Sequence, residues 1–192
     1  VTRKLAAIMF TDIAGFTKLS SQDETAAANL LNTQRKTLQP IVKEYDGKWL
    51  KEMGDGLLLT FNSATRAVQC AIKIQEITQE IENLNLRIGI HQGEVIEQDG
   101  DVIGDDVNVA SRIEPFSAVG GIAISNKIQA DIASNTEFVT KYIGKPQLKG
   151  VAQNIEVYCI TSHNLSETDI SQVSAKLEKE KFSFAKKILF PA

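Results

Sequence analysis

This sequence of 192 residues has few cysteines and histidines and no long apolar run, and each of these exclusions narrows the class of protein. It contains two cysteines and two histidines, too few for a disulfide scaffold or for a zinc site of the usual spacing. Cys70 and Cys159 stand inside apolar runs, which is typical of small buried side chains in a reducing compartment. No apolar run reaches the ~18 residues of a membrane-spanning helix, so no span is predicted.

The sequence also lacks a large excess of charge of either sign. The chain carries 21 basic and 24 acidic residues, a net charge of −3, which gives no strong electrostatic attraction to nucleic acid. With 43% hydrophobic residues, the composition is that of a soluble globular protein, and the length suits one domain with a short appendage. The chain starts at Val1 without an apolar signal-peptide core, so we expect a cytoplasmic domain of a longer membrane or multidomain protein.

Hydrophobic patterning predicts a series of strands and helices. The run Leu5–Phe10 is typical of a buried strand, and the two apolar runs around Gly54-Asp55-Gly56 predict a hairpin. One long helical stretch is expected before Asp46-Gly47. Beyond the hairpin, helices are expected at about 63–82, 106–116 and 126–133, and strands at 85–97, 121–125, 137–143 and 155–160. The order β-α-β-β-α-β predicts an α+β fold with a ferredoxin-like core, elaborated at its C-terminal end.

The sequence changes character after Ile160. We expect a catalytic domain over 1–160 and a separate segment over 161–192, made of a polar stretch and a helix at 175–190. That segment is interpreted as a linker or tail; the alternative is a juxtamembrane end or a bridge to a further domain.

Two carboxylates are predicted to meet at one edge of the sheet. Asp12 follows the first buried strand, and Asp55 lies in the hairpin turn. Because the first strand pairs beside that hairpin in a β-α-β-β fold, both side chains can converge there. Two carboxylates together with phosphate oxygens suit Mg²⁺. The alternative makes Asp12 a helix cap and Asp55 an ordinary turn residue.

The segment that joins the first strand to the first helix predicts a phosphate site. Backbone N–H groups near a helix start have no partner within the helix and can bind an anion. Here those groups belong to Ile13, Ala14, Gly15, Phe16 and Thr17.

A third feature is the string Asn108-Val-Ala-Ser-Arg112. On a helix, Asn108 and Arg112 point the same way, and an amide with a guanidinium can hold a ribose and a phosphate. The plainer interpretation pairs Arg112 with Glu114 or another surface acid.

His91, in the string GIHQG, is interpreted as a structural strand histidine rather than a catalytic base.

Four strings, in order, carry a family resemblance: MFTDIAGFT, LKEMGDGLLLTF, GDVIGDDVNVASRIE and LKGV. Together they resemble the motifs of class III nucleotidyl cyclases, over about residues 3–160. The resemblance implies a ferredoxin-like catalytic core that works as a head-to-tail homodimer, with active sites at the interface.

By resemblance, Asp12 and Asp55 are ligands of two divalent ions, Mg²⁺ or Mn²⁺, with Ile13 at the same metal site. Asn108 then orients the ribose, and Arg112 neutralises charge on the α-phosphate.

The family also implies which residues contact the rest of the substrate. Lys51 and Asp101 fall where the family binds the purine. Some members carry a second lysine after the LKG turn for the terminal phosphates; here that position is Val151, and Lys149 is the substitute.

The base preference follows from hydrogen-bond polarity. Lys51 only donates and an ionised Asp101 only accepts, which matches the N1 acceptor and the amino donor of adenine. Guanine reverses both, so ATP is the predicted substrate and cyclic AMP the product. The alternative to purine binding is that Lys51 is a solvated strand lysine and Asp101 an ordinary turn residue. The rival functions are a guanylyl cyclase and a catalytically silent nucleotide-binding or dimerisation module.

Overall fold

The fold is organised around two long central strands, β1 (Thr2–Ile13) and β4 (Leu86–Gln98), in a computed structural model that describes residues 2–173. They pair antiparallel from Thr2 opposite Glu97 to Ile13 opposite Leu86. The sheet order is β2-β3-β1-β4-β6-β8-β7, and β5 pairs with the end of β4. The pairing of β4 with β6 is parallel, and all other pairings are antiparallel. The sheet is therefore mixed.

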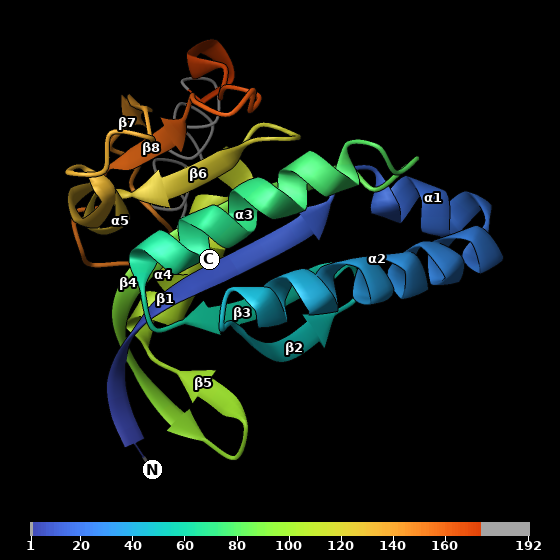
Figure 1. Cartoon of the computed structure of the whole chain (residues 1–192), viewed down its shortest axis with the longest axis horizontal. Helices are drawn as coiled ribbons and strands as arrows, with labels where there is room; N and C mark the ends of the chain where they lie inside the picture. Colours follow the sequence, from blue (N-terminus) through green and yellow to red (C-terminus); the bar gives the residue numbers. More distant parts are fainter. Residues whose placement is uncertain (1, 174–192) are drawn as a thin grey trace, which may run out of the picture.

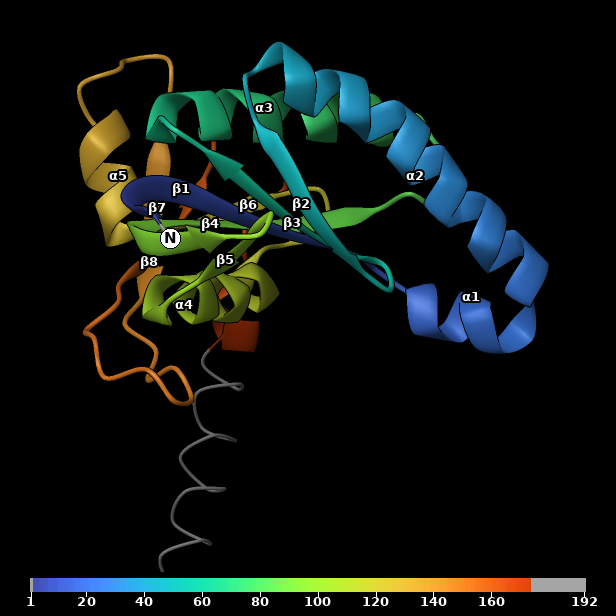
Figure 2. The same ribbon diagram turned by 90° about the horizontal axis from the view of Figure 1, so that it is seen from below.

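Helices cover both faces of this sheet, with α2 and α3 on one side and α4 on the other (Figures 1 and 2). Alternation along β1 explains the two layers: Ala7 and Met9 belong to the core beneath α2 and α3, whereas Ala6 and Ile8 pack with Ala110 of α4. A continuous apolar run is thus required because this strand is buried on both faces.

The expected β-α-β-β-α-β order is confirmed and is followed by the C-terminal elaboration. The remaining elements are α1 (Phe16–Gln22), α2 (Glu24–Glu44), β2 (Lys48–Met53), β3 (Gly56–Phe61), α3 (Ala64–Thr78), β5 (Asp101–Ile103), α4 (Asp105–Ile113), the short 3₁₀ helix η1 (Glu114–Phe116), β6 (Ile122–Ser125), α5 (Asn126–Ile132), β7 (Thr140–Gly144) and β8 (Val157–Ile160). Within the described residues, the predicted strands, and the helices predicted after the hairpin, lie within a few residues of their expected bounds.

Two local predictions were wrong. The single long helix before Gly47 is two helices, because Asp23 is extended (φ −154°) and its side chain caps α2 by accepting a hydrogen bond from Ala26 N–H. The short strand β5 was not predicted; Asp101, for which a turn position was the alternative, is its first residue. The helix expected at 175–190 lies outside the described residues.

Residues 162–173, predicted as polar linker, lie against the domain. The Thr168 hydroxyl donates to the Phe116 carbonyl at 2.7 Å, Ser166 N–H donates to the Gly120 carbonyl, and Val173 is buried. No helix in the described part of the chain is long and apolar enough to cross a membrane.

Candidate active site

Asp12 and Asp55 are brought together at the end of β1. Asp55 lies in the tight turn between β2 and β3, and its Oδ2 accepts a hydrogen bond from Ile13 N–H at 2.9 Å. The buried side chain of Gln34, on α2, approaches the Asp55 carbonyl at 3.4 Å. The β2–β3 turn is therefore held against the end of β1 by backbone and side-chain hydrogen bonds, and both carboxylates are half-buried.

Two residues that the sequence analysis did not place in the site complete this cluster. Arg87, opposite Asp12 in the β1–β4 pairing, brings its Nη1 to 3.3 Å from Asp12 Oδ1. Glu114, which was considered only as a surface partner for Arg112, is instead 6% exposed. Two sequence signals could have indicated them: Glu114 stands in the apolar string IEPF, and Arg87 stands in a predicted strand.

Glu114 is an unusual acid because of where it lies. Burial, together with the hydrogen bond and charge of Asp12, raises the pKa of Glu114 to about 9, and Arg87 only partly opposes this. Its Oε1 is buried without a hydrogen-bond partner in the described structure. Gly89 makes this position possible, since a side chain there would overlap the Glu114 backbone.

The donor set fits a hard divalent cation bound jointly with substrate. Within residues 2–173, no group of three acidic, histidine or cysteine side chains is arranged to hold an ion alone. Mg²⁺ typically takes one or two carboxylates, waters and substrate phosphates, which is what Asp12 and Asp55 would offer.

The predicted phosphate loop is only partly available. Ile13 N–H is used by Asp55, and Ala14 N–H donates to the Asn85 carbonyl at 2.8 Å, so two of the five expected donors are occupied. Gly15, in the left-handed region at φ 79°, turns the chain into α1. The donors that remain are the N–H groups of Gly15, Phe16 and Thr17.

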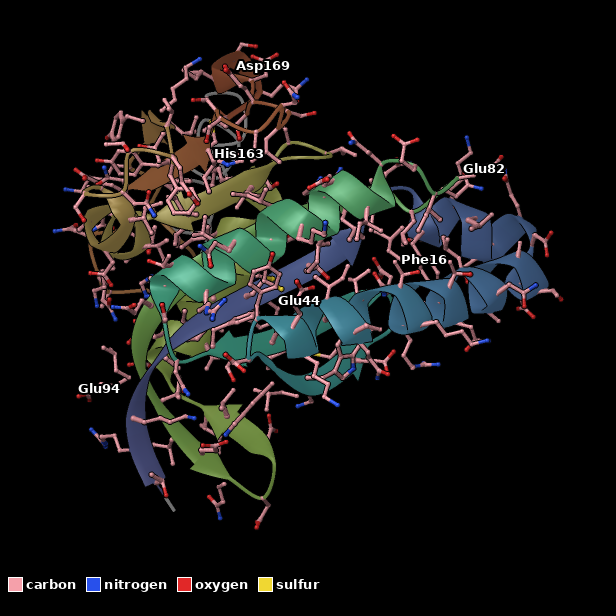
Figure 3. The ribbon with its side chains drawn as sticks, viewed as in Figure 1. Phe16, Glu44, Glu82, Glu94, His163 and Asp169 are labelled. Carbon is pink, nitrogen blue, oxygen red and sulfur yellow. The ribbon has the colours of Figure 1, made fainter. Side chains whose placement is uncertain are left out.

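Phe16 contributes its backbone rather than its ring to this loop. Figure 3 labels Phe16 where α1 begins, near α2, and its ring packs against the core beneath α2 and α3.

Asn108 and Arg112 lie on α4, and both side chains are exposed. The opposite side of α4 is apolar, with Val109, Ala110 and Ile113 buried. Within residues 2–173, neither Asn108 nor Arg112 makes a side-chain hydrogen bond or ion pair, so helix placement alone positions them.

Lys51 and Asp101 form an ion pair away from the carboxylates. Lys51 Nζ is 3.2 Å from Asp101 Oδ2, and both side chains are about half exposed. The Val102 N–H and then Lys51 lower the pKa of Asp101, which keeps it an acceptor. The two come from β2 and from the β4–β5 hairpin, which Figure 1 shows far from the end of β1.

The remaining predicted residues do not join either group. Lys149 is exposed in the loop before β8, and Val151 packs against the apolar cluster beneath α4. Two cavities, of about 500 and 190 Å³, are lined by other residues. Within one chain, the predicted site residues thus form three separate groups. These are the carboxylates at the end of β1, the Lys51–Asp101 pair, and the exposed side chains of Asn108 and Arg112 on α4.

The sequence matches the family described as "Adenylate and Guanylate cyclase catalytic domain" over residues 2–162. The chain belongs to this family. This cyclase domain is 32% identical over 166 residues to putative adenylate cyclase 3 of Rhizobium meliloti, a match that covers 82% of the chain and 28% of that relative. The chain therefore spans about a quarter of this curated relative's length.

Solved structures of adenylyl and of guanylyl cyclases resemble this cyclase domain equally well. The adenylyl cyclase CyaB from P. aeruginosa matches with a TM-score of 0.76 and 26% identity, over 84% of this chain and 95% of that one. The guanylate cyclase domain of RhGC from Catenaria anguillulae, in complex with GTP, matches with a TM-score of 0.76 and 28% identity, over 84% and 99%. The domain is a class III nucleotidyl cyclase domain.

Proposed function

We propose that this cyclase domain converts ATP into 3′,5′-cyclic AMP and pyrophosphate. The observation that carries the choice of ATP is the Lys51–Asp101 pair. These side chains lie 3.2 Å apart, so one donor and one acceptor are presented side by side to a planar base. A base with an adjacent acceptor and donor, as in adenine, can insert between them and satisfy both.

Guanine would meet the same pair with the opposite polarity. Its N1–H would face the Lys51 ammonium and its O6 would face the Asp101 carboxylate. Leaving polar groups against the wrong partner costs about 1–3 kcal/mol for each group. The two mismatches together favour ATP by roughly two orders of magnitude or more.

We assign the phosphates to the end of β1. The N–H groups of Gly15, Phe16 and Thr17 lie at the start of α1, where helix N–H groups have no partner within the helix, and we assign them to the phosphate oxygens. Asp12 and Asp55, with Ile13 in the same turn, are the residues that would hold two divalent ions. When bound there, such ions supply Lewis-acid activation of the ribose 3′-hydroxyl and neutralise the leaving pyrophosphate.

Asn108 and Arg112 are assigned to the reacting centre. Asn108 binds the ribose and holds its 3′-hydroxyl in line with the α-phosphorus, and Arg112 stabilises the negative charge that develops on the α-phosphate. Lys149 is the candidate for the terminal phosphates. The 3′-hydroxyl gives up its proton to water as its oxygen bonds to the α-phosphorus and the bond to pyrophosphate breaks, so no external reactant is consumed.

We further propose that two copies of the chain share each site, head to tail. The exposed positions of Asn108 and Arg112, without partners in the described chain, are what a site completed by a second copy requires. Large exposed apolar side chains lie close in sequence to the carboxylates and to the Lys51–Asp101 pair. Met53 lies two residues before Asp55, and Ile103 lies two residues after Asp101. Such side chains beside polar site residues favour an interface.

The test is product identification with the full 192-residue chain. The protein is incubated with ATP or GTP, each with Mg²⁺ or Mn²⁺, and cyclic AMP and cyclic GMP are quantified by chromatography. We expect cyclic AMP from ATP to dominate. Predominant cyclic GMP would make the domain a guanylyl cyclase, and nucleotide binding without either product would make it a silent binding module.

A further inference from the structure

One face of β4 is shaped to receive α4. Gly89, His91 and Gly93 alternate along this strand and face the same way. A Cβ at Gly89 would overlap the start of η1, and a Cβ at Gly93 would overlap the Asp106 carboxyl group. Two glycines therefore allow α4 and η1 to lie directly on the sheet, as Figure 2 shows for α4.

Between these glycines, His91 makes a hydrogen-bonded connection to the start of α4. His91 Nε2 is 2.8 Å from Asp106 Oδ1, and His91 Nδ1 is 2.8 Å from Ser125 Oγ. Gln153 Nε2 donates to the same Asp106 oxygen at 3.3 Å. Ser125 Oγ also accepts from Ile128 N–H, which caps α5.

A single tautomer satisfies every member of this chain of hydrogen bonds. With the proton on Nε2, His91 donates to Asp106 and accepts at Nδ1 from the Ser125 hydroxyl. The Ser125 oxygen keeps a lone pair for Ile128 N–H. Burial lowers the pKa of His91, which favours the neutral imidazole that this arrangement needs, although Asp106 opposes the shift.

The order Ser125–His91–Asp106 is that of a nucleophilic triad, but its burial excludes that role. Both Ser125 and His91 are 0% exposed, and neither lines the cavities described above. A substrate carbonyl cannot reach the serine oxygen. The arrangement is therefore structural.

The connection holds the elements that carry the proposed substrate contacts. Asp106 lies in the first turn of α4, two residues before Asn108 and six before Arg112. Gln153 lies four residues after Lys149 in the loop before β8. Since the side chains of Asn108 and Arg112 make no hydrogen bond or ion pair within residues 2–173, their positions depend on how α4 is fixed.

We propose that Asp106, held by His91 and Gln153 in the space left by Gly93, is a positioning residue that places Asn108 and Arg112 for the cyclase reaction. The inference rests on the proposed function, because it presumes that those two side chains act on substrate. A rigid helix transmits a shift at its first turn to both side chains, and misplacement by about 1 Å can cost about 10²-fold in rate.

The experiment is a double-mutant cycle measured as kcat and KM for ATP with the full chain. Asp106→Ala is expected to lower kcat by about 10²-fold and to change KM less, since the Lys51–Asp101 pair is untouched. Asp106→Asn keeps an oxygen that accepts from His91 and Gln153, and should retain most of the activity. Combined with Arg112→Ala, the Asp106→Ala loss should be much smaller than in the wild-type background.

Matched controls separate positioning from general damage. Asp105→Asn removes a neighbouring first-turn charge without touching His91 and should leave kcat near wild type. Urea unfolding of each variant measures the folded fraction. If Asp106→Ala and Arg112→Ala losses multiply fully, or if Asp106→Asn is as inactive as Asp106→Ala, the inference is wrong.

A second readout does not depend on activity. Nitrogen-15 NMR of the two histidines should show His91 with its proton on Nε2, and this signal should change in Asp106→Ala while His163 stays the same. A proton on Nδ1 of His91 would overturn the inference even in an active enzyme. Conversely, a wild-type chain that makes no cyclic nucleotide but shows the expected tautomer would overturn the proposed function and leave the hydrogen-bonded network intact.

Discussion

The carboxylate cluster of Asp12, Asp55 and Glu114 is held on every side by its own chain, whereas Asn108 and Arg112 are held only by the helix that carries them. The first group is half-buried or buried, with hydrogen bonds from Ile13 N–H and an ion pair to Arg87. The second is exposed and has no partner in the described residues. Contacts within one chain therefore fix the carboxylate cluster, whereas the side chains of Asn108 and Arg112 have no such contacts within residues 2–173.

This difference predicts how each region responds to change. A substitution in the carboxylate cluster changes a group whose geometry is fixed within its own chain. A substitution on α4 should depend on what the helix meets across an interface.

The largest effect is expected from the carboxylates. Asp12→Asn and Asp55→Asn should each lower kcat by at least about 10³-fold, since the amide keeps the shape but loses the negative charge that holds cations. Asp55→Asn still accepts from Ile13 N–H, so circular dichroism should be unchanged. Asp131→Asn, on the surface of α5, is the control and should retain wild-type kcat. Near-normal activity of either site variant at low millimolar Mg²⁺ would refute the metal assignment.

A smaller change is expected at the Lys51–Asp101 pair. Lys51→Glu combined with Asp101→Ser presents an acceptor and a donor in the reverse order. The ratio of ATP to GTP turnover should fall by about 10- to 100-fold, given about 1–3 kcal/mol for each reversed hydrogen bond. Total rate is expected to fall too, so the ratio is the quantity to measure. A ratio equal to wild type would show that neither side chain contacts the base.

Mixing two inactive variants tests whether the regions meet between chains. In a two-fold dimer of Asp55→Asn with Arg112→Ala, one site carries both lesions and the other carries none. Equal mixing makes about half the dimers mixed, each with one intact site of two, so roughly a quarter of wild-type activity should return. Subunit exchange is verified with two differently tagged chains. Exchange without any recovered cyclic AMP would place the whole site within one chain.

A last prediction concerns stability rather than activity, at Glu114. In the folded protein its pKa is about 9, against about 4.5 in the unfolded chain, so between these values only the folded state keeps the proton. Wild-type stability should therefore fall as pH rises through this window, by at most about 1.4 kcal/mol per pH unit. Glu114→Gln lacks this dependence and should gain stability relative to wild type between pH 5.5 and 8.5.

Urea unfolding in the presence of a chelator measures that difference. The chelator matters because a cation at the neighbouring carboxylates would favour the ionised glutamate. Equal pH slopes for wild type and Glu114→Gln would mean that Glu114 ionises at an ordinary pH.

Sequence reasoning could place elements whose signals are local. The hairpin around Gly54-Asp55-Gly56 and the paired strands at Asp12 follow from turn chemistry and apolar patterning, and both were found where expected. The break at Asp23 was missed because apolar spacing continues through it, and only the extended backbone shows the cap.

What could not be predicted depends on contacts distant in sequence. Arg87 reaches Asp12 only through the β1–β4 register, and Glu114 is buried only because Gly89 lets η1 approach. The loop donors of Ile13 and Ala14 were predicted to be available, but tertiary partners at Asp55 and Asn85 use them. Pairings of this kind are set by the fold as a whole.

The burial of Val173 gives the domain a mechanical property. Val173 belongs to the same apolar cluster as Val109 and Ile113, the inward side of α4. Packed interiors have low compressibility, so a displacement at one edge of such a cluster is passed to its other members. A pull or twist applied at position 173 would therefore be felt as a change in tilt of α4, and Arg112, on its outer side, would swing with it. Residues 162–173 are therefore connected through packing to the helix that carries Asn108 and Arg112.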